Sequence, residues 1–96
     1  MRVHMTVEWD GTVIEIKSNL WAMALWERKY KVKFFSAWNE GKVGMEDLAY
    51  LAYETMRSSG HVVPAVFDDF LKKADALDLI SVDTARPTDG APTDGN

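Results

Sequence analysis

The sequence predicts an α+β domain, with an N-terminal β-hairpin packed on a small bundle of three to four helices and a disordered C-terminal tail. Residues 2–18 alternate polar and apolar side chains around a turn signal, and residues 20–77 carry apolar residues at helical spacing. Residues 81–96 contain almost no side chain that could fill a core and repeat the motif P-T-D-G. We therefore expect a compact domain over residues 1–80 and a flexible tail over residues 81–96.

The hairpin prediction depends on Asp10-Gly11, because a two-residue type I′ turn needs positive φ at both central positions. Such a turn would place Trp9 opposite Thr12, Val7 opposite Ile14, Met5 opposite Ile16 and Val3 opposite Ser18. This register gathers the apolar side chains on one face: Val3, Met5, Val7, Trp9, Ile14 and Ile16. The other face is polar except for Val13. An isolated hairpin is only marginally stable in water, so helices should cover the apolar face.

The first two helical segments differ in how clearly the sequence defines them. Ser18-Asn19 offers an N-cap to a helix over residues 20–30, which carries apolar side chains on nearly all sides. Residues 31–42 fit either a third short strand or a helix continuing through Trp38, and Gly41 and Gly44 would end it.

The later helices are better marked. Residues 45–58 form an amphipathic pattern with acidic residues in the first turn and Gly60 shortly after the end. Pro64 suits the first position of a last helix that would run to about Ala76 or Leu77. The apolar residues expected to line that helix are Val66, Phe67, Phe70, Leu71, Ala74 and Leu77. An extended segment, Asp78–Ile80, would then lead to the tail.

Composition excludes several classes of protein. The chain has no cysteine, which excludes disulfides and thiolate metal sites, and no stretch approaches the roughly 20 apolar residues of a membrane span. We therefore expect a soluble, cytosolic protein without membrane contact. The net charge is −4, and the only basic cluster, Arg28 to Lys33, sits where lysines complement a helix dipole. Nucleic acid is consequently not an expected partner.

No catalytic arrangement is recognisable, so we expect no enzyme, no cofactor and no metal site. His4 and His61 are far apart and have no metal-ligand spacing, and neighbouring Asp68 and Asp69 would point apart on a helix. The sequence contains no glycine-rich phosphate loop and no G-x-S-x-G.

The surplus of aromatic residues points to protein binding instead. Four tryptophans are many for a core of this size, and Trp and Tyr are favoured anchors at interfaces. The residues predicted to contact a partner are Trp21, Leu25, Trp26, Tyr30, Tyr50 and Tyr53. The sequence is equally compatible with all of these aromatic residues lying in the core.

Three motifs follow one another in an informative order. W-E-R-K-Y (Trp26–Tyr30) lies in the first helix, L-A-Y-L-A-Y (Leu48–Tyr53) in the middle helix, F-D-D-F-L (Phe67–Leu71) in the last, and a Pro/Thr/Asp tail ends the chain. Over roughly residues 5–96 this order resembles that of the small tail assembly chaperones of long-tailed, siphovirus-like bacteriophages.

The resemblance implies a function. Such chaperones coat the tape measure protein, keep it soluble and help to bring tail tube protein subunits to it in the host cytoplasm, and they are absent from the mature virion. In that family a programmed ribosomal frameshift often adds a C-terminal extension at the tail. The repeated P-T-D-G would then belong to a tether between two binding modules.

Two alternatives remain open from the sequence. The chain could be a phage head–tail connector or completion protein, in which the edges of the hairpin would drive formation of a homo-oligomer. It could also be a small DNA-binding or antitoxin-like regulator that contacts DNA through Arg28, Lys29, Lys31 and Lys33.

Overall fold

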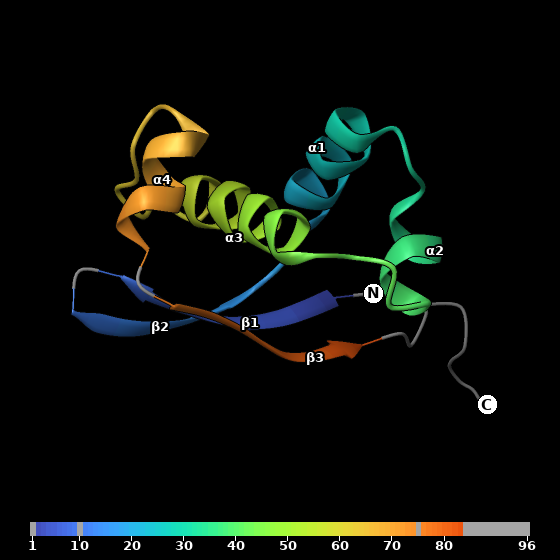
Figure 1. Cartoon of the computed structure of the whole chain (residues 1–96), viewed down its shortest axis with the longest axis horizontal. Coiled ribbons are helices and arrows are strands. Elements are labelled where there is room, and N and C mark those ends of the chain that lie inside the picture. The colour runs from blue at the N-terminus through green and yellow to red at the C-terminus, as the bar shows by residue number, and fades with distance from the viewer. Residues whose placement is uncertain (1, 10, 75, 84–96) are drawn as a thin grey trace.

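The computed structural model describes residues 2–9, 11–74 and 76–83. Within them the chain forms two layers, a three-stranded antiparallel sheet and four helices that lie over one of its faces (Figure 1). In chain order the elements are β1 (Arg2–Trp9), β2 (Thr12–Lys17), α1 (Leu20–Tyr30), α2 (Phe34–Asn39), α3 (Met45–Ser58), α4 (Phe67–Lys73) and β3 (Ala76–Asp83). The predicted α+β class is confirmed.

The hairpin has the predicted register. β1 and β2 pair antiparallel with Trp9 opposite Thr12, Val7 opposite Ile14 and Met5 opposite Ile16. Beyond the last pair, Val3 and Ser18 are joined by two hydrogen bonds, from Ser18 N–H to Val3 O (2.9 Å) and from Val3 N–H to Ser18 Oγ (2.8 Å). Gly11 has the positive φ of a tight turn, 77°. Asp10 lies outside the described residues, so the type I′ turn stays a prediction.

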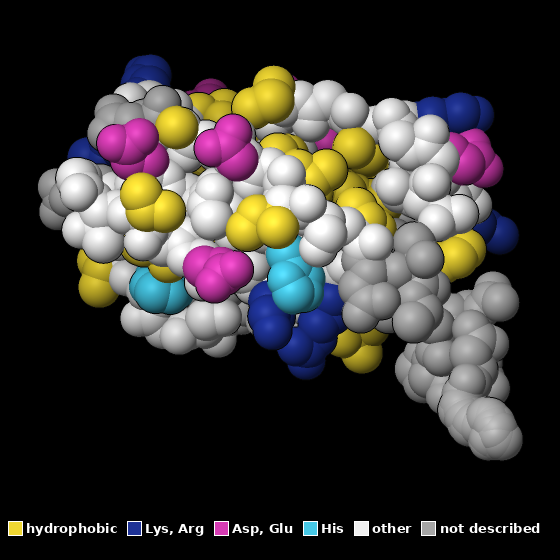
Figure 2. All heavy atoms as spheres, turned by 90° about the horizontal axis from the view of Figure 1, so that it is seen from below, with side chains coloured by type: hydrophobic (Ala, Val, Ile, Leu, Met, Phe, Trp, Pro, Cys, Tyr) yellow, Lys and Arg dark blue, Asp and Glu magenta, His cyan; other side chains and the backbone are white. Residues whose placement is uncertain are grey.

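The two faces of the sheet differ as expected. Val3, Met5 and Val7 are fully buried under the helices, and Trp9 and Ile14 pack against the same core. The opposite face carries acidic, basic and histidine side chains interspersed with hydrophobic ones (Figure 2). Val13 is 67% exposed, which agrees with its place as the one apolar residue of the hairpin's polar face.

The strand β3 was not predicted as a strand. It pairs antiparallel with β1, and the order in the sheet is β2-β1-β3. The pairing sets Leu77 opposite Val7 and Val82 opposite Val3, so apolar side chains on β3 join the core. The expected boundary at residue 80 is therefore wrong by three residues, because the ordered strand continues to Asp83. The remainder of the expected tail, residues 84–96, lies outside the described residues.

The segment after α1 forms a separate short helix. Lys31 adopts a left-handed conformation (φ 60°) and its N–H donates to the carbonyl of Glu27 (2.9 Å), which ends α1. The Glu27 carboxylate Oε2 then accepts from the N–H of Phe34 (2.7 Å), satisfying a free donor at the start of α2. Of the two conformations left open for residues 31–42, the structure has a helix, but one that is interrupted at Lys31.

The last helix is shorter than predicted. α4 begins at Phe67 and ends at Lys73, and Pro64 lies outside it. The carbonyl of Pro64 instead accepts a hydrogen bond from the Tyr53 hydroxyl (2.7 Å), which ties the loop to α3. Val66 and Leu71 are exposed, so they do not line the core as expected, whereas Phe70 is fully buried.

The core is rich in aromatic contacts. Trp26 meets Phe34 and Trp38 edge to face, with ring centroids 5.4 Å and 5.8 Å apart, and Trp9 stacks on Phe70 at 5.1 Å. Edge-to-face and offset rings of this kind favour one arrangement of the helices. The aromatic residues of α1 and α2 thus fix α2 against α1 despite its length of six residues.

Candidate partner-binding surface

The structure divides the six predicted partner-binding residues into three pairs. Trp26 and Tyr53 are each 2% exposed and belong to the core. The prediction that these two contact a partner is corrected, because a partner could reach them only by opening the domain. Trp21 and Leu25 line an open groove, and Tyr30 and Tyr50 form a separate, half-buried cluster.

The groove lies between α1 and α3 and has a volume of about 490 Å³. Its wall on α1 consists of Trp21 and Leu25, which are four residues apart and therefore lie on the same side of the helix. Trp21 is 58% exposed, and Leu25 is partly buried. The wall on α3 is polar and consists of Glu54, Arg57 and Ser58. We call this feature the α1–α3 groove.

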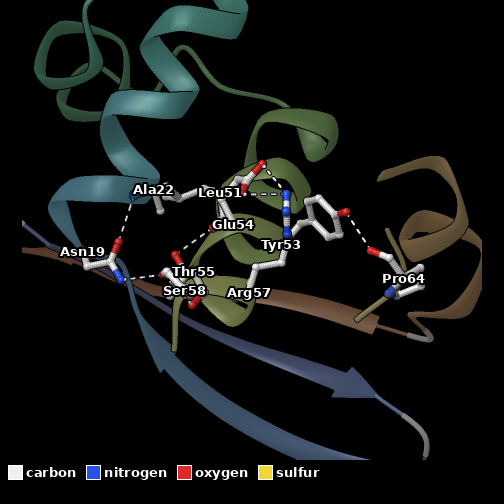
Figure 3. A network of polar contacts seen from close by, with 9 residues as sticks. All are labelled: Asn19, Ala22, Leu51, Tyr53, Glu54, Thr55, Arg57, Ser58 and Pro64. Atoms are coloured by element: carbon white, nitrogen blue, oxygen red, sulfur yellow. Dashed lines mark hydrogen bonds and ion pairs between the residues drawn. The ribbon is translucent and has the colours of Figure 1, made fainter. Parts of the chain in front are cut away.

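A short chain of hydrogen bonds holds the two walls in place (Figure 3). Asn19 caps α1 by accepting from Ala22 N–H at Oδ1 (2.8 Å), and its Nδ2 donates to Ser58 Oγ at the end of α3 (2.8 Å). Ser58 Oγ in turn donates to the carbonyl of Thr55 (3.0 Å). One side chain, Asn19, therefore both starts α1 and joins it to the last turn of α3. Hydrogen bonds within the chain therefore set the spacing of the groove.

On the polar wall, an exposed arginine forms an ion pair with a buried glutamate. Glu54 is 5% exposed, and its Oε1 lies 3.4 Å from Arg57 Nη1. The Arg57 guanidinium also lies over the Tyr53 ring, with 5.4 Å from Cζ to the centroid. A planar guanidinium held against a ring keeps unused N–H groups for another acceptor. The α1–α3 groove therefore combines an apolar wall with hydrogen-bonding capacity opposite.

The second surface is the cluster of Tyr30, Tyr50 and Phe67, with the Lys29 ammonium above it. Tyr50 meets Tyr30 and Phe67 edge to face, with centroids 5.9 Å and 5.1 Å apart, and Lys29 Nζ lies 5.1 Å from the Tyr50 centroid. Tyr30 donates to Glu46 Oε2 (3.0 Å). We call it the tyrosine cluster; it joins α1, α3 and α4.

Ionisation of both tyrosines is opposed in the folded chain. Burial raises the pKa of Tyr50 from 10.0 to about 12, and the neighbouring Glu54 carboxylate adds to that rise. Burial and then the hydrogen bond to Glu46 raise the pKa of Tyr30 further. Both hydroxyls therefore stay neutral donors at physiological pH.

Sequence reasoning missed the apolar surface beside β3. Met45 is 65% exposed and Leu79 is 45% exposed, and both line an apolar groove between the start of α3 and β3. The apolar spacing of residues 45–58 includes Met45, so the pattern alone would place it on the buried side of α3. Met45 is, however, the first residue of that helix and follows Gly44, and this position at the helix end was the available signal that it could lie at the edge of the core.

The histidines and carboxylates of the described residues do not form a metal-type cluster. Within the described ranges, no group of three His, Asp or Glu side chains is placed to hold a metal ion. His61 is exposed and lines a hollow of about 500 Å³ with Trp9, Val62 and Lys73, whereas His4 lies on β1 opposite Lys17. In the part of the chain that the structure describes, no helix is long and apolar enough to cross a membrane.

The basic cluster is spread over the end of α1 and the loop after it. All four residues, Arg28, Lys29, Lys31 and Lys33, are exposed, and the ammonium of Lys29 lies over the aromatic rings of the tyrosine cluster. One of the four cations is thus engaged in a cation–π contact.

Comparisons of the chain with known protein families, curated proteins and solved structures found no significant match.

Proposed function

We propose that this chain is a tail assembly chaperone of a long-tailed bacteriophage that binds and solubilises the tape measure protein and helps to recruit tail tube subunits. The observation that carries the proposal is the exposed Trp21 beside Leu25 on the wall of the α1–α3 groove. The order of motifs, from Trp26–Tyr30 to Phe67–Leu71, supports the assignment to this class through its resemblance.

The groove suits an amphipathic helix as its ligand. An apolar side chain of the helix would contact Trp21 and Leu25, and a polar group beside it would meet Arg57 on the opposite wall. A tape measure protein is a long helical chain, so many copies of a small chaperone can bind along it. Each contact can then be weak, because avidity multiplies the contacts.

The same proposal places the chain in the host cytoplasm during assembly and not in the finished virion. Residues 84–96 would connect this domain to a second module in a frameshifted form, so that one module holds the tape measure protein while the other contacts tail tube protein.

The test is binding of purified chain to a helical fragment of the tape measure protein. The gene immediately downstream identifies that protein if it is a very long open reading frame of helical sequence. Trp21→Ser should weaken binding by about 2 kcal/mol, roughly 30-fold, because an aromatic anchor is lost. Its own stability should change by less than about 1 kcal/mol, because Trp21 is 58% exposed.

Val13→Ser is the matched control, because Val13 is 67% exposed and lies on the hairpin, outside the α1–α3 groove. It should bind like the unmodified chain. Equal binding by Trp21→Ser would refute the site. Salt-dependent retention on DNA that disappears when Arg28, Lys31 and Lys33 are replaced by Gln would instead favour a regulator. Presence of the chain in purified virions would favour a connector.

A further inference from the structure

The strand β3 forms an open edge of the sheet. Among the described residues it pairs only with β1. Alternate residues of an edge strand direct their N–H and C=O groups away from the sheet, where another strand can bind them. At the middle of this edge, Leu79 is 45% exposed and Ile80 is 51% exposed.

The composition of β3 leaves that edge without the usual protection. Edge strands are commonly blunted by lysine or proline. β3 contains neither, and its charged residues are Asp78 and Asp83. The opposite edge strand, β2, is shorter and carries both Glu15 and Lys17. The two edges of the sheet are therefore not equivalent, and β3 is the one open to pairing.

We propose that β3 pairs antiparallel with β3 of a second copy of this chain, joining two three-stranded sheets into one continuous sheet. This inference does not depend on the proposed function. A second copy of this chain is the expected partner because of the sequence of β3 itself. Two copies of β3 can pair with their side-chain faces matched in one register and not in the register shifted by a single residue.

The favoured register has its two-fold axis between Leu79 and Ile80. It sets Leu77 opposite Val82 of the partner subunit and Asp78 opposite Ser81 of the partner subunit. Leu77 and Val82 both face core residues of β1, whereas Asp78 and Ser81 lie opposite Thr6 and His4. Equivalent faces therefore meet, and the helices of both copies lie on the same side of the joint sheet.

The β-bulge in β3 is the reason that Leu77 and Val82 lie on the same face of the strand. The pairing with β1 shifts between His4 and Met5, so Ile80 is an extra residue on β3. If Ile80 occupied a regular position in the ladder, residues 77 and 82 would be five positions apart and would point to opposite faces, because side chains alternate along a strand. The bulge also interrupts the ladder at the axis. Hydrogen bonds to the second copy would therefore come from Leu77 and Val82, because Val7 and Val3 opposite them direct their own backbone groups towards β2.

The length of the strand selects this register over the next one. In the proposed register each residue from Ala76 to Asp83 lies opposite a residue of β3 in the second copy. A shift by two residues would also match the faces, but it would set Ala76 and Leu77 opposite positions past Asp83, the last residue of β3.

An apolar groove beside the edge would be covered by the same contact. It has a volume of about 470 Å³, and Met45, Leu48, Leu77 and Leu79 are among the residues lining it. Because the helices of both copies lie on one side, the two grooves meet at the joined edge. The apolar area removed from water there adds to the backbone hydrogen bonds.

Cysteine cross-linking tests the register directly, because the chain has no cysteine of its own. Directly opposed residues have Cα atoms about 4.5–5.5 Å apart, within the range that a disulfide spans. A mixture of Asp78→Cys chains and Ser81→Cys chains should form mixed disulfide dimers on mild oxidation. Either chain alone should not, because residue 78 and its own counterpart are about 10 Å apart in this register.

The mass in solution tests the dimer itself. Light scattering during gel filtration of the unmodified chain should give twice 10.9 kDa at micromolar concentrations. Ile80→Lys should raise the dissociation constant roughly tenfold or more, because it places charge beside the axis. Val13→Lys, a substitution at an exposed position on the other edge strand, should leave the dissociation constant unchanged.

Circular dichroism shows whether each variant is folded. If the Ile80→Lys chain does not fold, the cysteine experiment still tests the proposal, because it does not use that variant. The mass of one chain at every concentration would overturn the proposal. Dimers unaffected by Ile80→Lys would overturn it as well. Mixtures that cross-link no faster than Asp78→Cys alone would refute the register.

Discussion

At the scale of single residues, helix geometry decides which tryptophan a partner can reach. Trp21 and Trp26 both lie in α1, but five positions at about 100° each place them roughly 140° apart around the helix. A helix with one face on the core cannot bury both, and Trp26 is the one that is buried. The sequence could not choose between them, because Leu20, Trp21, Leu25 and Trp26 spread apolar surface around most of the helix.

The tyrosine cluster predicts a loss of stability at high pH. The pKa of Tyr50 is about 12 in the folded chain and 10.0 ordinarily, so the folded state holds its proton more tightly than the unfolded state does. The contribution of this group is fully present below pH 10 and is lost as the pH rises towards 12. Tyr30, whose pKa is also raised, acts in the same direction.

Urea unfolding at intervals between pH 9 and pH 12 measures this loss. The free energy of unfolding should fall over that range in the unmodified chain. A chain with Tyr30→Phe and Tyr50→Phe together should show a flatter profile, because it lacks both ionisable hydroxyls. A decline of equal steepness in the double variant would assign the alkaline sensitivity to other groups.

At the scale of elements, the sequence predicted an element correctly where the residues that determine it lie within or next to that element. The hairpin register followed from the turn and the alternation, and α3 followed from its apolar spacing and its flanking glycines. The start of α1 followed from Asn19, which does cap it.

The elements that depend on distant contacts were not predictable in the same way. Pro64 resembles a helix start, but its carbonyl is held by Tyr53, and α4 begins three residues later. The apolar residues of β3 do not alternate, because the bulge at Ile80 shifts their faces. Only pairing with β1 gives Val82 a place against the core, and no pattern within residues 76–83 shows that pairing.

Two truncated chains test whether β3 ends at residue 83. A chain ending at Ile80 lacks Ser81–Asp83, which pair with Arg2–His4, and it lacks the contact of Val82 with the core. Its free energy of unfolding should be lower by about 1–2 kcal/mol than that of a chain ending at Asp83, from the burial of one valine. Equal stability in thermal or urea unfolding would place the end of the folded domain near residue 80 after all.

At the scale of the whole molecule, the fold separates two surfaces. The helices cover one face of the sheet, and the α1–α3 groove lies in that helical layer, whereas the open edge belongs to β3 (Figure 1). A dimer through β3 would therefore leave Trp21 of each copy free. Two grooves on one particle would bind a long helical partner with avidity.

The most direct test of the central proposal is the solubility of the tape measure protein. It should be expressed alone, with this chain, and with the Trp21→Ser chain, and its soluble fraction compared. The proposal predicts an insoluble tape measure protein alone, a soluble complex with the unmodified chain, and a marked loss of that complex with Trp21→Ser. A tape measure protein whose solubility is unaffected by the unmodified chain would contradict the proposed function.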